Sequence, residues 1–107
     1  MVEINQPAND QFQTKPDSRS LVELVIEGMK EKKATDITVM DVSDLTTLTD
    51  YFVICSGTSD TQIKAIADSI EEEVLKQTKE KPWKKEGIQA RNWIILDFIN
   101  IVVHVMS

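Results

Sequence analysis

The sequence contains very little of several residue types that mark specialised proteins. Its 107 residues include one cysteine, one histidine, three glycines and three prolines. Because the lone Cys55 has no partner within the chain, an internal disulfide is excluded, and the residue fits a reducing cytoplasm. No internal repeat or low-complexity tract is visible beyond a polar N-terminal segment.

Long hydrophobic runs and targeting signals are also missing. Charged residues interrupt every apolar stretch well before the roughly 20 residues that a membrane-spanning helix needs. The N-terminus lacks the basic and then apolar pattern of a secretory signal. Its acids Glu3, Asp10 and Asp17 outnumber the single base Lys15, unlike an organelle transit peptide. We therefore expect a cytoplasmic protein that has no membrane partner.

Basic residues are in the minority. The chain carries 12 lysines and arginines against 18 aspartates and glutamates, which gives a net charge of −6. Binding to a phosphate backbone relies on many lysine and arginine contacts, so this charge argues against direct, sequence-specific binding to nucleic acid. A basic protein surface is the better expected partner.

What is present fits one small folded domain. Hydrophobic residues make up 41% and charged residues 28% of the chain, a balance typical of a globular protein. Residues 1–17 are rich in Asn, Gln and Pro and show no apolar periodicity, which predicts a flexible N-terminal tail. The domain is expected over residues 18–107.

Two capping boxes predict two helices. Ser20 with Glu23 precedes an apolar helical face, and this helix is expected to end near residues 32–34, where lysines suit the negative end of the helix dipole. Ser59 with Gln62 marks the start of the second helix. The clearest helical periodicity in the chain follows it, formed by Ile63, Ile66, Ala67, Ile70 and Val74.

Four apolar segments predict strands. Residues 37–42 mostly alternate between apolar and polar, as in a half-buried strand. The continuous run 51–55 is typical of a strand covered on both faces, and we expect it at the centre of the sheet. Residues 93–96 and 101–103 predict a hairpin. The basic stretch 79–85 is expected to form a loop that can include a short edge strand.

Three sequence blocks, in this order, resemble the ribosomal silencing factor family, also called the Iojap family. They are DYFVICSGTS at residues 50–59, KAIAD at 64–68, and WIILD at 93–97 leading to VVHV at 102–105. The match covers residues 21–106. The joint occurrence of the three blocks is far more specific than any one of them.

The resemblance implies both a fold and a function. The implied fold is α/β of the α+β type, a single mixed sheet flanked by helices, similar to the nucleotidyltransferase fold but without its catalytic residues. Members of the family bind the large ribosomal subunit through a protein on its intersubunit face. They block the joining of the small subunit and so repress translation under nutrient limitation. No enzymatic activity, cofactor or metal is expected.

The chain departs from the family pattern at two places. Ile99 and Asn100 stand where the family usually has Gly and Asp, and a glycine there would supply the positive φ of a tight hairpin turn. We expect Asn100 to take this role in part, because Asn tolerates left-handed geometry better than Ile. The family also usually continues beyond the position of Ser107 into a tail with an aromatic and acidic motif, so contacts of such a tail are not carried over.

The candidate partner-binding residues are Trp93, Ile95, Asp97 and Phe98 on the hairpin and Lys64 on the second helix. The resemblance places this hairpin at the docking surface, and aromatic side chains commonly anchor interfaces. Trp93 and Asp97 are an even number of positions apart, so on a regular strand they share a face, while Phe98 falls at the turn. The alternatives are a core position for Trp93 and a turn-forming role for Asp97.

Residues with catalytic potential have structural explanations as well. Gly57-Thr58-Ser59 is either a phosphate cradle or a strand end followed by a helix N-cap, and the capping box favours the cap. His104 is either a general base or a structural histidine, and Cys55 is either a nucleophile or a small buried hydrophobic residue. Structural roles are favoured, because the sequence places no nucleophile beside His104 and no base beside Cys55.

Two other functions stay open as alternatives. A minimal nucleotidyltransferase needs an Asp-x-Asp pair to hold its metal, and the sequence contains none. A homodimeric scaffold that pairs through an exposed strand edge is compatible with ribosome binding. Lys84 and Lys85 beside Trp83 resemble a small nucleic-acid patch, although a solvated loop fits better in so acidic a chain.

Overall fold

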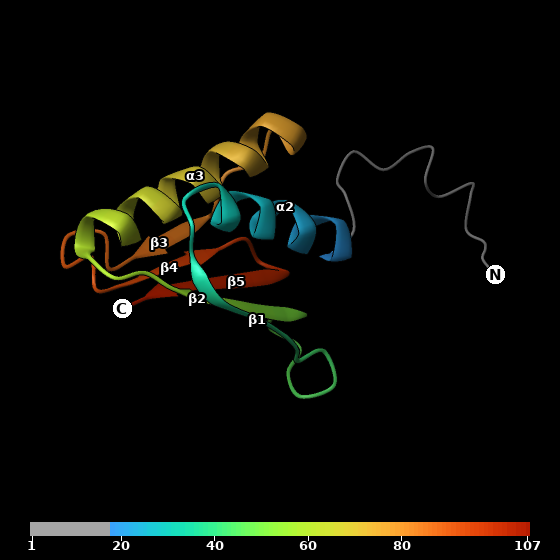
Figure 1. Ribbon diagram of the computed structural model, residues 1–107. Helices are drawn as coiled ribbons and strands as arrows, with labels where there is room; N and C mark the ends of the chain where they lie inside the picture. Colours follow the sequence, from blue (N-terminus) through green and yellow to red (C-terminus); the bar gives the residue numbers. More distant parts are fainter. Residues whose placement is uncertain (1–17) are drawn as a thin grey trace.

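Residues 18–107, which the structure describes, form one five-stranded sheet with two helices on one of its faces (Figure 1). The structure is a computed structural model, and the flexible tail expected for residues 1–17 lies outside its described part. With the labels of Figure 1, the elements are α2 (Ser18–Glu31), β1 (Thr35–Asp41), β2 (Tyr51–Ser56), α3 (Asp60–Thr78), β3 (Lys84–Glu86), β4 (Trp93–Asp97) and β5 (Ile101–Met106). The predicted mixed sheet flanked by helices is confirmed.

Helix α3 begins with the capping interactions that its sequence predicts. The Ser59 hydroxyl oxygen accepts a hydrogen bond from the Gln62 backbone N–H at 3.1 Å, and Gln62 Oε1 accepts one from the Thr58 N–H at 2.7 Å. At the other end, Lys79 has a left-handed φ of 65° and donates its N–H to the Leu75 carbonyl at 2.9 Å. Local groups therefore fix both ends of this helix.

Helix α2 is present where the capping box of Ser20 and Glu23 predicts a helix, and Ser18, the first described residue, already belongs to it. The Ser18 hydroxyl donates a hydrogen bond to Oδ2 of Asp50 at 2.8 Å. This hydrogen bond, between residues 32 positions apart, joins the first described turn of α2 to the start of β2.

The two helices approach each other closely at Gly28. The buried Ser69 hydroxyl of α3 donates a hydrogen bond to the Gly28 carbonyl at 2.8 Å. A Cβ atom added to Gly28 would lie 2.7 Å from the Cα atom of Ile70, which is closer than real Cβ contacts. Any larger residue at this position must push the helices apart.

The strand order is β1-β2-β5-β4-β3, which places β5 rather than β2 at the centre of the sheet. β2 runs parallel to β5, and the other neighbouring strands are antiparallel. The prediction that residues 51–55 form a central strand covered on both faces is wrong. Val53 and Cys55 are buried, but Phe52 and Ile54 are only half-buried, because the described helices cover one face of the sheet.

The strand predicted for residues 37–42 is present as β1, but it is an edge strand and is mostly exposed, so the expected half-burial is wrong. Val39 is 41% and Met40 is 43% exposed. Val42 is buried, but it lies in the loop after the strand. An edge strand has a neighbour on one side only, so an alternating sequence does not ensure its burial.

The predicted hairpin of β4 and β5 is present, and its turn has a backbone conformation that its sequence disfavours. Ile99 has a φ of 78°, and the Asn100 N–H donates across it to the Phe98 carbonyl at 3.0 Å, as in the γ-turn with a positive central φ. Ile99, and not Asn100, is therefore the left-handed residue, which corrects the prediction. Oδ1 of Asp97 supports the turn by accepting the Ile99 N–H at 2.8 Å.

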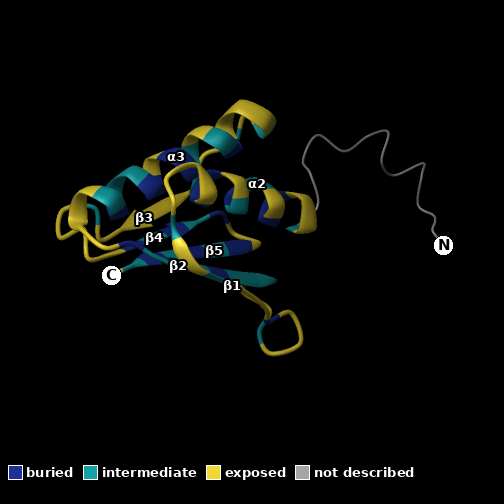
Figure 2. Cartoon of the chain, viewed as in Figure 1, coloured by how far each residue is buried: buried dark blue, intermediate teal, exposed yellow. Residues whose placement is uncertain are grey.

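The core lies between the two helices and the sheet face that they cover (Figure 2). Its largest fully buried side chains are Val25, Met29, Ile63, Ile66, Ile70 and Val74 from the helices and Val53, Ile94, Leu96, Ile101, Val103 and Val105 from the sheet. Burying one side chain of this kind contributes about 1.5–3 kcal/mol. The alternate residues of the same strands point to the opposite face.

Candidate docking surface

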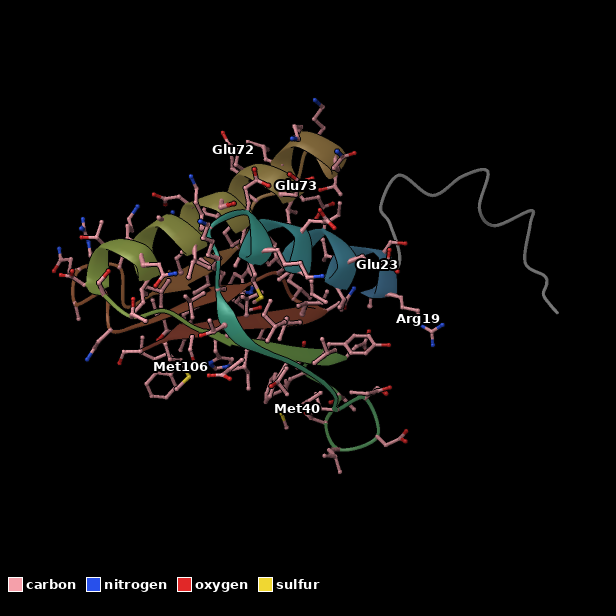
Figure 3. The ribbon with its side chains drawn as sticks, in the orientation of Figure 1. Arg19, Glu23, Met40, Glu72, Glu73 and Met106 are labelled. Atoms are coloured by element: carbon pink, nitrogen blue, oxygen red, sulfur yellow. The ribbon has the colours of Figure 1, made fainter. Side chains whose placement is uncertain are left out.

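The strand register brings fourteen side chains together on the sheet face opposite the helices, which we call the open face. Residues that pair directly across neighbouring strands share a face. The first row is Met40, Phe52, Val102, Asp97 and Lys84; the second is Thr38, Ile54, His104, Ile95 and Glu86; the third is Thr35, Ser56, Met106 and Trp93. Figure 3 shows Met40 and Met106 on the side of the sheet away from the helices.

The open face is apolar in its middle and charged at its β3 edge. The half-buried apolar side chains in the middle are Phe52, Ile54, Ile95, Val102 and Met106. Trp93 and Met40 are 50% and 43% exposed. Lys84 and Glu86 form an ion pair at 3.4 Å on β3, beside Asp97. An apolar centre with a polar rim is the usual composition of a protein interface.

His104 and Trp93 form a hydrogen-bonded aromatic cluster on the open face. Nε1–H of Trp93 donates to Nδ1 of His104 at 3.1 Å, and the two ring centroids are 6.0 Å apart. Phe52 makes a T-shaped contact with the imidazole, with 5.5 Å between centroids. Because Nδ1 accepts a hydrogen bond, the neutral ring carries its proton on Nε2. Partial burial lowers the pKa of His104 and so favours the neutral form.

Three of the predicted binding residues lie on the open face. Trp93, Ile95 and Asp97 alternate with buried neighbours along β4, so the prediction that Trp93 and Asp97 share a face is confirmed. Trp93 lies at the surface rather than in the core. Asp97 also has the turn-forming role, since it accepts the Ile99 N–H while it remains half-buried on this face.

The other two predicted binding residues lie elsewhere. Phe98 is 8% exposed and belongs to the core cluster, because it continues the inward alternation of Ile94 and Leu96. Lys64 lies on α3 in the helix layer, across the sheet from the open face, and it pairs with Asp68 at 2.6 Å. The structure thus separates both residues from the open face.

The strand pairing also places on the open face residues that the sequence alone did not assign to a docking surface. Phe52 and Ile54 lie beside His104, although the continuous apolar run 51–55 does not show which of its residues turn outward. His104, expected as a structural residue, occupies the middle row of the open face. The alternation within a strand is readable in the sequence, whereas the neighbour of each strand is not.

Within the described residues, the candidates for chemistry take part in structural contacts. The Thr58 N–H binds Gln62 and the Ser59 hydroxyl caps α3, which leaves the helix cap, not a phosphate cradle, as the observed role. Cys55 is buried, and burial raises the pKa of its thiol to about 12, which suppresses the nucleophilic thiolate. The described part of the chain contains no group of three or more possible metal ligands.

Two lysines of the basic segment before β4 pair with carboxylates. Lys84 pairs with Glu86 at 3.4 Å, and Lys85 reaches Glu71 of α3 at 3.3 Å. Trp83, beside them, is 65% exposed. The short edge strand expected here is present as β3, and its ion pairs favour a solvated edge over a nucleic-acid patch.

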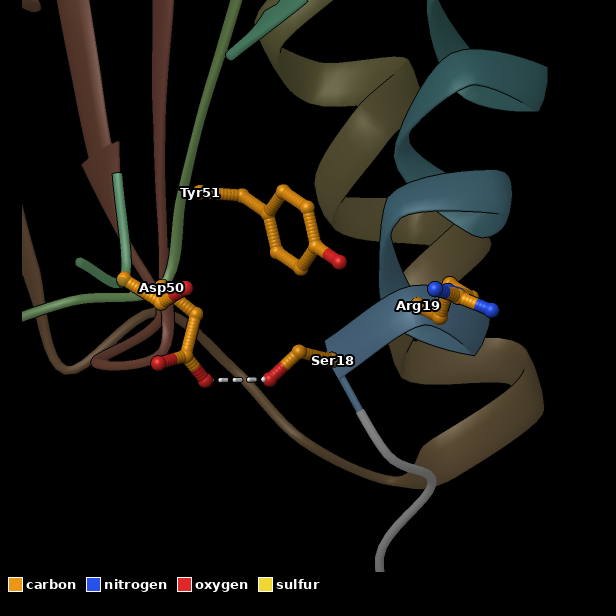
Figure 4. A pocket seen from close by; sticks show the side chains of 5 residues that line it. Ser18, Arg19, Asp50 and Tyr51 are labelled. Carbon is orange, nitrogen blue, oxygen red and sulfur yellow. Dashed lines mark hydrogen bonds between the residues drawn. The ribbon is translucent and has the colours of Figure 1, made fainter. Parts of the chain in front are cut away.

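A hollow of about 430 Å³ lies where the start of α2 meets β2 (Figure 4). It is lined by Ser18, Arg19, Ser43, Asp50 and Tyr51. The Asp50 carboxylate accepts the Ser18 hydroxyl at 2.8 Å, so the polar groups of the hollow join the helix layer to the sheet. We assign this hollow a structural role.

The architecture defines the class of protein. It is an α+β domain with an apolar open face, and none of its described helices has the length and apolar character needed to cross a membrane. The same fold occurs in the crystal structure of a protein from Chromobacterium violaceum, with a TM-score of 0.80 and 32% identity. The similarity covers 85% of this chain and 75% of that one.

Sequence comparison then identifies the family. Residues 15–107 match the family described as ribosomal silencing factor during starvation, RsfS. The ribosomal silencing factor of Haemophilus influenzae is 37% identical over 88 residues, which cover 82% of this chain and 85% of that protein. A mouse protein named mitochondrial assembly of ribosomal large subunit protein 1 is 32% identical over 79% of this chain and 38% of its own length. The chain belongs to the ribosomal silencing factor family.

Proposed function

We propose that the protein acts in the cytoplasm as a translational repressor that docks its open face on a protein of the large ribosomal subunit and thereby keeps the small subunit away. Membership of the silencing factor family supports the general role. The name of the mouse relative refers to the ribosomal large subunit, which supports this subunit as the partner. The apolar open face, which no described helix covers, is the observation that carries the proposal.

Trp93 is the best-placed anchor for such an interface. A stable interface buries about 800 Å² on each partner, and aromatic residues are common among those that contribute most to binding. The Trp93 ring is half exposed and already held by His104, so binding costs it little side-chain freedom. Ile95 and Phe52 extend the apolar area around this cluster.

The charge of the chain supports a protein partner rather than ribosomal RNA. The net charge is −6, and Asp97 and Glu86 add carboxylates to the open face. Lys84, the basic residue of this face, is paired with Glu86 at 3.4 Å. Carboxylates suit a partner surface with arginine or lysine. We expect a weaker salt dependence than that of a protein that neutralises six or more phosphates.

Steric exclusion follows from the one-sided layering of the domain. Because both described helices lie on the far side of the sheet, a molecule docked through its open face presents the helix layer outward (Figure 1). The bound domain, one sheet and one helix layer thick, then occupies the space where the small subunit would bind. The mechanism needs no chemical step and no cofactor.

Co-sedimentation with isolated ribosomal subunits tests the proposal. Wild-type protein is expected to pellet with large subunits and not with small ones. Trp93→Ala should weaken binding by about tenfold or more, as expected for an interface anchor. Trp83→Ala is the matched control, because Trp83 is 65% exposed but lies outside the open face, and it should bind normally. Equal binding of the wild-type protein to both subunits, or to neither, would overturn the proposal.

A second copy of the chain is an alternative partner, which the edge strands favour. β1 lies at one edge of the sheet and exposes Val39 and Met40. An exposed strand edge is able to pair with another chain. Sedimentation velocity at several concentrations detects such a dimer, and added large subunits should dissociate it if both partners use the open face.

A further inference from the structure

The loop of residues 42–50, which joins β1 to β2 and which we call the leucine loop, exposes two large apolar side chains. Leu45 is 81% and Leu48 is 83% exposed, more than any other large hydrophobic residue in the described part of the chain. A single exposed leucine is ordinary on a protein surface. Two of them on one short loop form an apolar projection that the described fold does not bury.

The leucine loop is held in shape by its own hydrogen bonds. Its ends are joined by the Val42 N–H, which donates to the Asp50 carbonyl at 2.8 Å, and Val42 is buried. Inside the loop, the Leu45 N–H donates to the Val42 carbonyl at 2.9 Å. The Leu48 N–H donates to the Thr46 hydroxyl at 3.1 Å. The fold therefore presents both leucines on an ordered loop, which reduces the entropy that binding costs.

The leucine loop continues the open face. It follows β1, whose Met40 lies at the outer end of a row of the open face. Figure 1 shows the loop projecting beyond the sheet on the side away from the helices, and Figure 3 shows Met40 beside it. A partner that covers the open face therefore meets the loop at its border.

The size of the open face also points to an additional contact. It has fourteen side chains, whereas a specific interface usually involves 20–30 residues from each partner. The seven residues of the loop 42–50 that are not buried bring the combined surface to 21 residues, within this range. The leucine loop therefore enlarges the proposed interface to the usual size.

The charges near the two leucines identify the kind of partner. Residues 41–50 include Asp41, Asp44 and Asp50 but no lysine or arginine. Hydrogen bonds from the Ser43 side chain and backbone hold the pKa of Asp41 below its ordinary value, so this carboxylate stays charged. Carboxylates repel the phosphates of RNA and of anionic membranes. An apolar groove with a basic rim on a protein suits this loop.

We infer that the leucine loop is a second docking element, whose Leu45 and Leu48 insert into an apolar, basic-rimmed groove of the same ribosomal protein that covers the open face. This inference rests on the proposed function of the open face. It assigns the loop a part in affinity that is separate from the Trp93 cluster.

The double substitution Leu45→Ser with Leu48→Ser tests the inference. It should weaken binding to isolated large subunits by about tenfold or more, because two apolar anchors are lost. The melting temperature should not change, since neither side chain is in the core. Leu75→Ser is the control, because Leu75 is 38% exposed on α3, away from both surfaces. Asp44→Lys leaves the leucines intact and should also weaken binding.

The outcomes separate this inference from the proposed function. If the double variant and Asp44→Lys bind like wild type while Trp93→Ala binds weakly, the leucine loop is not a contact and the docking of the open face stands. If the wild-type protein does not bind large subunits, both fail. A cross-linker on Leu48→Cys should reach the same ribosomal protein as one on Thr38→Cys; cross-linking to RNA or to another protein would overturn the assigned partner.

Discussion

Ile99 has a left-handed backbone conformation that a β-branched side chain disfavours. Its φ is 78° and its side chain is 55% exposed, so little burial offsets the strain. Such conformations cost of order 1–3 kcal/mol and persist where the surroundings enforce them. Here the Phe98 N–H donates to the Ile101 carbonyl at 2.8 Å, which closes the turn between two paired strands.

We expect Ile99→Gly to raise the free energy of unfolding by about 1 kcal/mol, because relief of the strained backbone exceeds the entropy that glycine adds to the unfolded chain. Urea denaturation measures this change. Ile99→Ala removes most of the same side chain but keeps Cβ, so it should not stabilise the protein. Equal gains from alanine and glycine would show that backbone strain is not the cause.

His104 makes the stability of the protein depend on pH. Burial lowers its pKa below 6.5, so the unfolded chain binds this proton more readily than the folded one. The contribution to stability is fully present above pH 6.5 and is lost as the pH falls through the lowered pKa. Protonation also removes the acceptor of the Trp93 hydrogen bond, because both nitrogens of the imidazolium are donors.

We therefore expect acidification below pH 6.5 to lower the free energy of unfolding more in wild type than in His104→Gln, whose amide does not titrate. Binding to large subunits should fall over the same range in wild type. Urea denaturation and co-sedimentation across a pH series measure the two effects. Parallel pH profiles for wild type and variant would contradict this account.

At the scale of elements, the two helices differ in how far the sequence predicts them. The start of α3 depends on Ser59 and Gln62, which are neighbours in the chain, and the prediction is confirmed. The first described turn of α2 is joined to the sheet by a hydrogen bond from Ser18 to Asp50, 32 residues away, and no local pattern contains that contact. Strand composition likewise predicts β2 and β5, but their places in the sheet follow from pairing between distant segments.

In the candidate site too, the sequence predicts the features that depend on neighbouring residues but not those that depend on long-range contacts. The shared face of Trp93 and Asp97 follows from strand alternation, which the sequence contains. The positions of Phe98 and Lys64 depend on the direction of the turn and on which face the helices cover. His104 enters the open face through its pairing with β2 and β4, so only the register reveals it.

The close contact of α2 with α3 at Gly28 gives a prediction for the helix pair. Gly28→Ala should lower the free energy of unfolding by about 1–3 kcal/mol, because the new Cβ would lie 2.7 Å from the Cα atom of Ile70. In an uncrowded helix the same change would stabilise the protein by roughly 1 kcal/mol. Glu27→Ala, at an exposed neighbouring position, is the control for thermal and urea denaturation. A stabilised Gly28→Ala would show that the helices do not pack this closely.

At the scale of the whole molecule, the core and the proposed docking surface lie on opposite faces of one sheet. Val53, Val103 and Leu96 face the helices, while Phe52, His104 and Ile95 on the same strands face outward. Substitutions on the open face should therefore change binding more than the free energy of unfolding. This division is what makes the variants Trp93→Ala and Leu45→Ser with Leu48→Ser usable as tests of binding.

The central place of β5 has a consequence for how the protein is made. β2 and β4 share β5 as their common neighbour, yet β5 is the last of the described strands in chain order. Synthesis proceeds from the N-terminus, so a nascent chain holds β2 and β4 without the strand that joins them until residues 101–106 have left the exit tunnel. His104 and Met106 arrive on that same strand. A nascent chain therefore lacks the complete open face, and with it the proposed docking surface, until β5 has emerged.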